Sequence, residues 1–322
     1  MILVYGHADD PPIARLVAAL QTAGADFQLL DIAALARARL HLQMGPQGLA
    51  GELVVAGVPT ALADFRAVYA RPLEPALAPS AQQPALALHR RLVEWLDVAP
   101  ARVVSRPAAM QAHASRPLQA QSMGEAGFLV PPTLVTSDEA EVRAFRRTHG
   151  RVVCMSISGI RSSATELDDT WLSRMHRLAP WPTPLPTQFQ AHVPGVDVRV
   201  HVVGQQALAA EITCAGTDYR YAYRSGAALQ VVATTLPPGV AAQCVAMSQA
   251  MGLPLSGIDL RLRPDGEYVC FEVNPMPAFS YCEAESGLPI AAALAALLME
   301  YVTTQVPMAL PARRTDHPPQ AG

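Results

Sequence analysis

The segment from residue 257 to 274, GIDLRLRPDGEYVCFEVN, constrains the chain most strongly, because it predicts a β-hairpin whose register can be derived from the sequence. Its turn is the Asp-Gly pair at 265–266, the strongest short-range signal for a two-residue hairpin loop. Such a loop places Pro264 directly opposite Glu267, and every earlier pair along the two strands follows from that one. The segment therefore predicts which side chains share a face.

The two faces of this hairpin differ in character. One face carries apolar side chains suited to a core: Ile258, Leu260, Leu262, Val269, Phe271 and Val273. The other face carries polar side chains: Asp259, Arg261, Arg263, Tyr268, Glu272 and Asn274. Counting back from the turn sets Asp259 directly opposite Glu272, and two opposed carboxylates repel each other. This face is therefore expected to hold a cation, or to pair its acids with the arginines of the same hairpin.

A hard cation fits the polar face well. Asp259, Glu272 and Asn274 offer oxygen ligands, and Mg²⁺ typically takes one or two protein carboxylates together with waters and phosphate oxygens. On geometry alone, the pairing of these acids with Arg261 and Arg263 remains an equal alternative.

The residues that follow the second strand favour the metal. The pattern E-x-N-P, closing a strand that pairs with a G-I-D-L strand, resembles the metal-binding end of the ATP-grasp superfamily. It is most similar to the branch of the ribosomal-protein glutamate ligases and peptide-crosslinking maturases, the RimK-like enzymes. The resemblance implies ATP and two Mg²⁺ ions as cofactors, with Asp259, Glu272 and Asn274 holding the ions that bridge the ATP phosphates.

Composition excludes several other classes. A chain of 322 residues that is 51% hydrophobic can bury a sizeable core. Its net charge of −3 provides no general attraction for nucleic acid or anionic membrane, so neither partner is expected. The start MILVYGHADD lacks the features of a signal peptide, and five cysteines without C-x-x-C spacing suit reduced thiols. We expect a cytoplasmic protein without zinc or a disulfide framework.

All 24 basic residues of the chain are arginine, since it contains no lysine. This excludes a Schiff base, a P-loop lysine and a lysine general base. Arginine remains a good phosphate ligand, because its guanidinium group is always charged and donates two parallel hydrogen bonds. Anion binding is therefore still expected, although general drift from lysine to arginine explains most of the positions.

The N-terminal part predicts a parallel α/β lobe. A strand ILVYG, a helix with Pro near its first turn and Gly24 after its end, and a strand DFQLLD follow in order. No G-x-G-x-x-G follows the first strand, which excludes a nicotinamide enzyme. FRAVYARP predicts a further strand, and residues 84–97 predict an amphipathic helix on which His89 is expected to face solvent.

Residues 102–136 resemble the entrance to the nucleotide-binding lobe of ATP-grasp ligases. The basic residue before the second helix, which contacts the ATP phosphates in relatives, is here Arg116; without the family it is an ordinary solvated arginine. The strand RVVCM carries Met155 where relatives have a second lysine, and a thioether cannot neutralise phosphate. The resemblance implies that the following Ser/Gly loop folds over the phosphates. Our hypothesis is that Arg161 in this loop compensates for the missing lysine, while Ser158 and Gly159 offer hydroxyl and backbone donors to an anion. Otherwise the loop is an ordinary connection, and nucleotide affinity is weakened or lost.

Beyond a proline-rich connector, residues 188–212 resemble the adenine-binding hinge and the hairpin after it. The resemblance places Gln190, Ala191 and His192 at adenine and Asp197 near the ribose. It also matches Arg199 to the arginine that faces the transferred phosphate. His201 lies two residues on and shares its strand face.

The segment TDYRYAYRSG offers Arg220 as a contact to a substrate carboxylate or phosphate. An exposed strand edge on which arginines stack on tyrosines is an equal alternative.

Together these features predict an α/β chain with the ATP-grasp fold: an N-terminal parallel α/β lobe (1–105), a central lobe (106–185), a C-terminal mixed or antiparallel lobe with the metal site (186–306) and a disordered tail (307–322). The predicted activity is a Mg²⁺-dependent ligation of a carboxylate to an amine or other nucleophile through an acyl phosphate, releasing ADP and phosphate. Substrates are small molecules or peptides, and homo-oligomerisation is left open. The alternatives are a degenerate ATP-grasp protein that binds a peptide or partner without turnover, and a ribosomal-peptide maturase.

Overall fold

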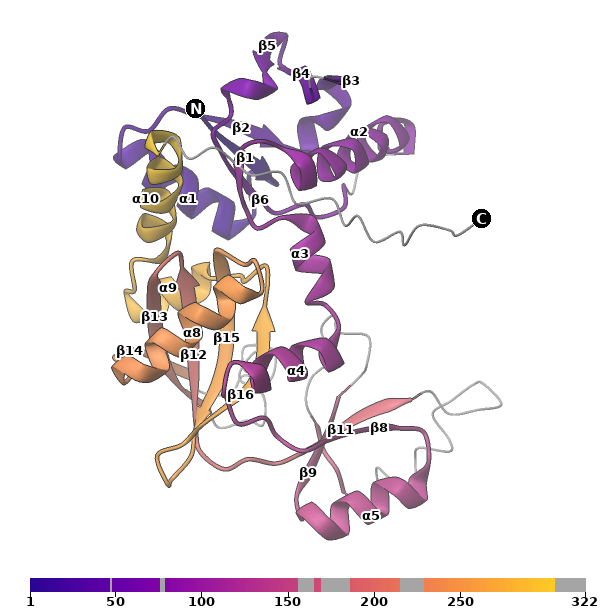
Figure 1. Ribbon diagram of the computed structural model, residues 1–322, viewed down its shortest axis with the longest axis vertical. Helices are drawn as coiled ribbons and strands as arrows, with labels where there is room; N and C mark the ends of the chain where they lie inside the picture. The colour runs from indigo at the N-terminus through magenta and orange to yellow at the C-terminus, as the bar shows by residue number, and fades with distance from the viewer. Residues whose placement is uncertain (47, 76–78, 156–164, 169–185, 215–228, 305–322) are drawn as a thin grey trace, which may run out of the picture.

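The computed structural model describes residues 1–46, 48–75, 79–155, 165–168, 186–214 and 229–304. Figure 1 shows an elongated molecule with the N-terminal lobe at one end, a C-terminal sheet in the middle and a small central lobe at the other end. Parallel and antiparallel sheets are both present, as the predicted fold class requires. No helix in the described part of the chain combines the length and apolarity needed to cross a membrane.

The N-terminal lobe is built on a parallel four-stranded sheet. Its strand order is β2-β1-β6-β7, made of Phe27–Asp31, Ile2–Gly6, Ala67–Ala70 and Arg102–Val104. The predicted strand-helix-strand opening is confirmed, with α1 at Pro11–Thr22 between β1 and β2. A small antiparallel sheet is inserted after β2, formed by β3 (Arg39–Gly45), β4 (Gly48–Val55) and β5 (Val58–Ala61).

Helices cover both faces of the parallel sheet. One face packs against α1 and against α10 (Ile290–Thr303), which returns from the far end of the sequence (Figure 1). The other face packs against α2 (Pro79–Val98) through the buried Trp95. Also on α2, His89 is only 6% exposed, and its Nδ1 lies 2.5 Å from the hydroxyl oxygen of Tyr5. The expected solvated position of His89 is therefore wrong, because its ring fills the gap between helix and sheet.

The central lobe is a small antiparallel sheet with one helix. Its strand order is β10-β9-β11-β8, made of Thr165–Glu166, Val152–Met155, Thr187–Ala191 and Thr133–Thr136, and its helix is α5 (Glu139–His149). Two helices, α3 (Pro107–Ala112) and α4 (Arg116–Glu125), lead into it. Strand β11 pairs with both β8 and β9. The predicted lobe boundary at residue 185 thus cuts off a strand of the central sheet.

The C-terminal lobe is a five-stranded antiparallel sheet. Its order is β14-β13-β12-β15-β16, made of Leu229–Thr234, Gln206–Cys214, Val196–Val203, Leu255–Leu262 and Tyr268–Asn274. Helix α8 (Pro238–Ala250) packs on one face through Cys244 and Met247, and α9 (Ser280–Ser286) follows the last strand. This sheet carries the predicted metal ligands.

The predicted hairpin forms, and Asp259 lies opposite Glu272 as expected. The loop, however, has three residues, because Arg263 N donates to Glu267 O at 2.9 Å and Gly266 takes a φ of 90°. A bulge on β16 then adds one residue to that strand, which shifts the register back by one position. The two irregularities offset each other, so the predicted pair is right although the predicted loop is wrong.

The bulge changes which residues of β16 face the core. Leu260 pairs with Cys270, which is fully buried, and Tyr268 packs beside the same core. Phe271 is the extra residue, and its half-buried ring lies 5.1 Å from the guanidinium carbon of Arg261 on the polar face. The assignment of Phe271 to the core face and of Tyr268 to the polar face was therefore wrong, since both followed from an unbroken register.

Candidate functional site

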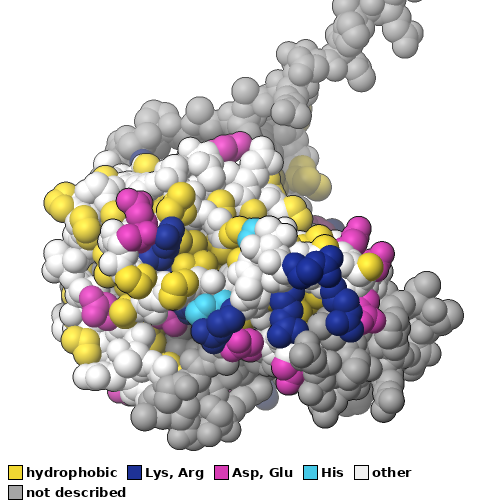
Figure 2. Space-filling view, turned by 90° about the horizontal axis from the view of Figure 1, so that it is seen from below, with side chains coloured by type: hydrophobic (Ala, Val, Ile, Leu, Met, Phe, Trp, Pro, Cys, Tyr) yellow, Lys and Arg dark blue, Asp and Glu magenta, His cyan; other side chains and the backbone are white. Residues whose placement is uncertain are grey.

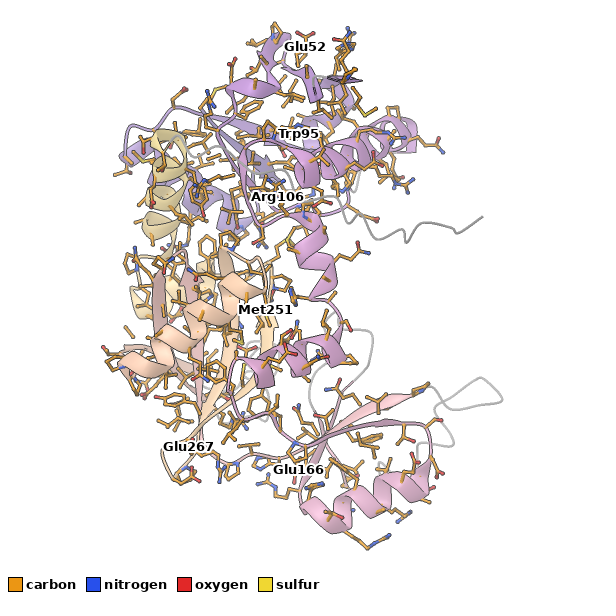
Figure 3. The ribbon with its side chains drawn as sticks, in the orientation of Figure 1. Glu52, Trp95, Arg106, Glu166, Met251 and Glu267 are labelled. Carbon is orange, nitrogen blue, oxygen red and sulfur yellow. The ribbon has the colours of Figure 1, made fainter. Side chains whose placement is uncertain are left out.

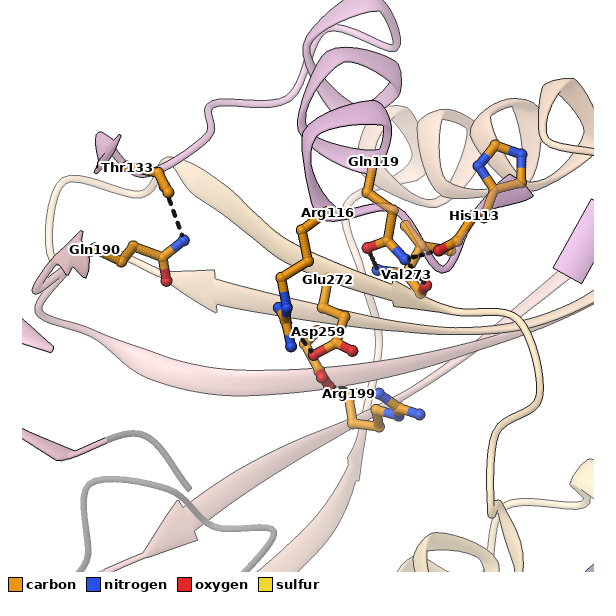
Figure 4. Close-up of polar contacts among 9 residues, drawn as sticks. All are labelled: His113, Arg116, Gln119, Thr133, Gln190, Arg199, Asp259, Glu272 and Val273. Atoms are coloured by element: carbon orange, nitrogen blue, oxygen red, sulfur yellow. Dashed lines mark hydrogen bonds and ion pairs between the residues drawn. The ribbon is translucent and has the colours of Figure 1, made fainter. Parts of the chain in front are cut away.

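Two carboxylates and two arginines meet on the polar face of the C-terminal sheet (Figure 4). Asp259 of β15 lies between two neighbours in register, Arg199 on β12 and Glu272 on β16. Arg199 Nη1 donates to Asp259 Oδ1 at 2.6 Å, and Arg116 Nη1 lies 4.0 Å from Glu272 Oε2. All four side chains are between 11% and 22% exposed, so their charges act in a partly desolvated setting.

The arginines of the hairpin itself are engaged elsewhere. Arg261 donates to Asp197 through Nε at 2.9 Å and Nη2 at 2.6 Å, and Arg263 pairs with Asp265. The interpretation in which Arg261 and Arg263 neutralise the two carboxylates is therefore wrong. Arginines from β12 and α4 take that place, which a count along one hairpin could not reveal. The same contacts bind Asp197 to the sheet.

Helix α4 is fastened to β16, the strand of the predicted ligands Glu272 and Asn274, through one glutamine. Gln119 Nε2 donates to the carbonyl oxygen of Val273 at 2.8 Å and its Oε1 accepts from Val273 N at 3.1 Å. The same Nε2 donates to His113 O. Gln119 therefore sets Arg116, one helical turn before it, against Glu272. Sequence reasoning missed Gln119, whose only signal was its three-residue spacing from Arg116.

A cavity of about 240 Å³ opens between α4, the central sheet and the bulge. Polar groups from three elements enter it, and its remaining lining is largely apolar; the main lining residues are Arg116, Met123, Val130, Gln188, Gln190 and Phe271. Gln190 Nε2 also donates to Thr133 Oγ1 at 3.3 Å (Figure 4). A flat apolar ring with polar edges would suit this cavity.

Of the residues predicted to contact adenine, only Gln190 is among the residues that line this cavity. Gln190 lines it, whereas Ala191 N donates to Pro132 O and His192 N to Arg151 O, both at 2.9 Å. These two backbone N–H groups thus serve the central sheet. Met155 ends β9, where its backbone pairs with Gln188 of the cavity lining. The predicted residues Ser158, Gly159, Arg161 and Arg220 lie outside the described residues.

Asn274, the third predicted oxygen ligand, lies at the end of β16. Its Oδ1 accepts a hydrogen bond from Met276 N at 2.9 Å, so the side chain is held by the loop that follows. Within the described ranges no three His, Cys, Asp or Glu residues cluster as metal ligands. A metal here would need amide, water or phosphate oxygens beside the two carboxylates, and such a set fits Mg²⁺.

Gly257 is required at the site by close packing. It lies opposite both His201 and Asn274, and a Cβ atom there would come 2.1 Å from Arg199 Nη2 and 2.8 Å from Pro277 Cβ. Gly257→Ala should therefore displace Arg199 or the loop and lower the free energy of unfolding by about 1–3 kcal/mol. Urea denaturation measures this, with Gly239→Ala as the control, since nothing lies within 4 Å of a Cβ at Gly239. Equal stability of the two variants would contradict the packing argument.

His201 gives the site a pH-dependent stability. Burial, together with the charge of Arg199, lowers the pKa of this 1% exposed imidazole well below 6.5, and its Nδ1 has no hydrogen-bond partner among the described residues. Below pH 6.5 the unfolded chain therefore binds a proton that the folded chain excludes. The free energy of unfolding consequently decreases as the pH is lowered. When the pH is lowered from 7.5 to 5.5, the free energy of unfolding of the His201→Leu variant should decrease by about 1 kcal/mol less than that of the wild type. Urea titrations at both pH values measure this, and His41→Leu, at an exposed position, should match the wild type.

A second hollow, of about 550 Å³, lies on the central lobe, on the face that Figure 2 shows. Its lining includes four arginines: Arg143, Arg146, Arg147 and Arg151. Arg143 pairs with Glu139 and Arg151 with Glu166, which removes much of the positive charge. Because two of the four arginines are paired with acids and exposed to solvent, we assign this cluster no ligand.

The chain is similar to a known family model and to solved structures. Residues 182–298 match the family model of the RimK-like ATP-grasp domain. The ATP-grasp ligase PsnB, solved with a phosphomimetic variant of its minimal precursor, Mg and ADP, is 25% identical with a TM-score of 0.75, over 93% of this chain and 98% of that one.

Two further structures share the fold. A RiPP-associated ATP-grasp ligase of Chryseobacterium gregarium, in complex with ADP and a leader and core peptide, has a TM-score of 0.77 at 20% identity, over 93% of this chain and 96% of that one. The macrocyclase MdnC of Microcystis aeruginosa, bound with the precursor peptide MdnA, has a TM-score of 0.73 at 19% identity, over 93% and 100%.

Proposed function

We propose that the chain is an ATP-grasp ligase of the RimK-like branch, and that it joins a carboxylate of a peptide to an amine or hydroxyl group at the expense of ATP. The observation that carries the proposal is the register pair of Asp259 and Glu272, flanked by Arg199 and Arg116. It combines ligands for Mg²⁺ with positive charge for phosphate on one face of one sheet.

The proposed reaction has two steps. An oxygen of the substrate carboxylate attacks the γ-phosphorus of ATP, which forms an acyl phosphate and releases ADP. The amine or hydroxyl group then attacks the acyl carbon, loses its proton and expels phosphate. Neither step needs a covalent nucleophile from the protein, so positioning and charge stabilisation are the contributions required of the site.

The side chains divide this work. Asp259, Glu272 and Asn274 would hold Mg²⁺, which when bound neutralises charge on the ATP phosphates. Arg199, whose guanidinium lies beside Asp259, stabilises negative charge on the transferring phosphoryl group. Arg116, the first residue of α4, supplies a second guanidinium on the side of Glu272, where the helix N-terminus adds a favourable dipole.

Two observations support a peptide as substrate and a nucleotide in the cavity beside Arg116. The similar structures contain precursor peptides bound to their enzymes, and one of them contains ADP together with Mg. The cavity combines an apolar lining with the amide side chains of Gln188 and Gln190, as an adenine site requires. We propose that the chain is a peptide maturase on these grounds.

Binding without turnover is the second candidate, and Met155 favours it. A lysine-free chain with a thioether at this strand position lacks one cation that ATP-grasp relatives carry. Against this candidate, the chain retains all three predicted oxygen ligands, Asp259, Glu272 and Asn274.

Calorimetric titration with ATP separates the two candidates. ATP should bind in the presence of Mg²⁺ and much more weakly after the metal is removed with a chelator. ADP release should then follow when acid-rich peptides with Ser, Thr or Lys are supplied. Metal-dependent ATP binding without ADP release from any peptide would favour the binding candidate. Absence of binding at millimolar ATP would contradict the ligase and would likewise favour a protein that binds a peptide or partner without turnover.

A further inference from the structure

Arg71 is a buried cation outside the predicted site. It follows β6 at the carboxyl edge of the N-terminal sheet, its backbone N donates to Tyr5 O at 2.8 Å, and it is 5% exposed. The guanidinium Nε donates to Asp10 Oδ2, at the start of α1. A buried ion pair of this kind fixes the direction of the guanidinium group, because leaving that position would strand the carboxylate.

The other arm of Arg71 crosses to the C-terminal lobe. Its Nη1 donates to Pro277 O at 3.0 Å and lies 3.4 Å from Met276 O. Met276 and Pro277 belong to the loop directly after Asn274, which ends β16. One side chain of the N-terminal lobe therefore holds the loop that ends the metal-ligand strand.

That loop contacts the candidate metal site at two points. Met276 N donates to Asn274 Oδ1, which sets the amide side chain of the third predicted ligand. Pro277 packs over Gly257, where a Cβ atom would meet both Pro277 and the guanidinium of Arg199. The position of the loop is thus coupled to Asn274 on one side and, across Gly257, to the Arg199–Asp259 pair on the other.

We propose that Arg71 is a positioning residue for the divalent-cation site, acting through the loop of residues 275–277. The inference rests on the proposed function, since it takes Asp259, Glu272 and Asn274 as the metal ligands. Residues that orient metal ligands typically change metal affinity about 10–100-fold when they are replaced. Arg71 has this role although it lies in a lobe to which the sequence assigned no part in metal binding.

Binding of Mn²⁺ in the presence of ADP, followed by electron paramagnetic resonance, tests the proposal. Arg71→Met should bind Mn²⁺ at least about 10-fold more weakly than the wild type. The double variant Asp10→Asn/Arg71→Met removes both members of the ion pair, so it leaves no uncompensated buried charge, and it should show the same loss. Arg71→Lys keeps a positive charge beside Asp10, but its single ammonium group has to serve both Asp10 and the loop carbonyl groups. Its loss of Mn²⁺ affinity should be smaller than that of Arg71→Met.

Arg15→Met is the matched control. Arg15 also joins the N-terminal lobe to the C-terminal part, through Glu283 at 3.3 Å, but it does not contact the loop. It should bind Mn²⁺ like the wild type, and circular dichroism should show that each variant is folded. If the methionine variants do not fold, the result with Arg71→Lys decides.

The outcomes separate this inference from the proposed function. A wild type that binds no Mn²⁺ with ADP overturns both. A wild type that binds, with Glu272→Gln that does not, supports the proposed metal site. If the folded Arg71 variants then bind as tightly as the wild type, or if Arg15→Met loses as much as they do, only the positioning role is overturned.

Discussion

Glu272→Gln should lower the affinity for Mn²⁺ in the presence of ADP by at least about 100-fold, and ADP formation from ATP should become undetectable. The substitution keeps the size of the side chain but replaces a carboxylate oxygen with an amide nitrogen, which cannot bind a cation. It also relieves the repulsion between Glu272 and Asp259, so the fold should be retained or slightly stabilised. Electron paramagnetic resonance measures the metal, and a coupled assay measures ADP.

Glu267→Gln is the control for this prediction. Glu267 is exposed at the tip of the same hairpin, and Figure 3 shows it at the end remote from the N-terminal lobe. The same chemical change there should leave metal binding and ADP formation at wild-type levels. Full activity of a folded Glu272→Gln protein would show that the opposed carboxylates do not bind the catalytic metal.

Arg199→Met should reduce turnover by roughly 10³-fold, the lower end of what a charge-stabilising arginine contributes to phosphoryl transfer. Metal affinity should stay the same or rise, because Arg199 Nη1 now donates to Asp259 Oδ1 and competes with a cation for that oxygen. The two effects therefore go in different directions in one variant. ADP formation with a peptide substrate measures the first, and Mn²⁺ binding measures the second.

Arg263→Met serves as the matched arginine control. Arg263 is 39% exposed and pairs with Asp265 beside the turn, so its loss should change neither quantity. An Arg199→Met protein with normal turnover would exclude Arg199 from the phosphoryl-transfer step. A variant in which turnover and ATP affinity fall by the same factor would instead indicate that Arg199 binds ATP equally in the ground state and the transition state.

Local sequence signals predicted much of the fold and the centre of the site. Strand alternation and an Asp-Gly turn predicted the pair of Asp259 and Glu272, and the structure has this pair because the longer loop and the bulge offset each other. Neither the three-residue loop nor the bulge at Phe271 could be predicted, because both depend on contacts that β16 makes outside the hairpin. Cys270 N, for example, donates to the carbonyl oxygen of Leu129, which belongs to the segment that follows α4.

Contacts between distant elements account for the rest. The arginines facing Asp259 and Glu272 come from positions 60 and 156 residues earlier in the chain, and no periodicity in a single segment identifies such partners. The same holds for His89. The amphipathic pattern of its helix does not reveal that the hydroxyl group of Tyr5, on the sheet, is its hydrogen-bond partner. At these positions the sequence predicted the helix or strand that carries the residue, but it did not predict the partner that contacts it.

The last described helix has a consequence for how the protein is made. Helix α10 covers the sheet face that also packs against α1, so strands synthesised first wait for a partner synthesised more than 250 residues later. Until that partner leaves the ribosome, the nascent N-terminal lobe exposes an apolar surface that chaperones or other chains can bind. The lobe therefore completes its folding only after α10 has been synthesised, and a chain that stalls before α10 would be a target for proteolysis even though all strands of the C-terminal sheet have already been synthesised.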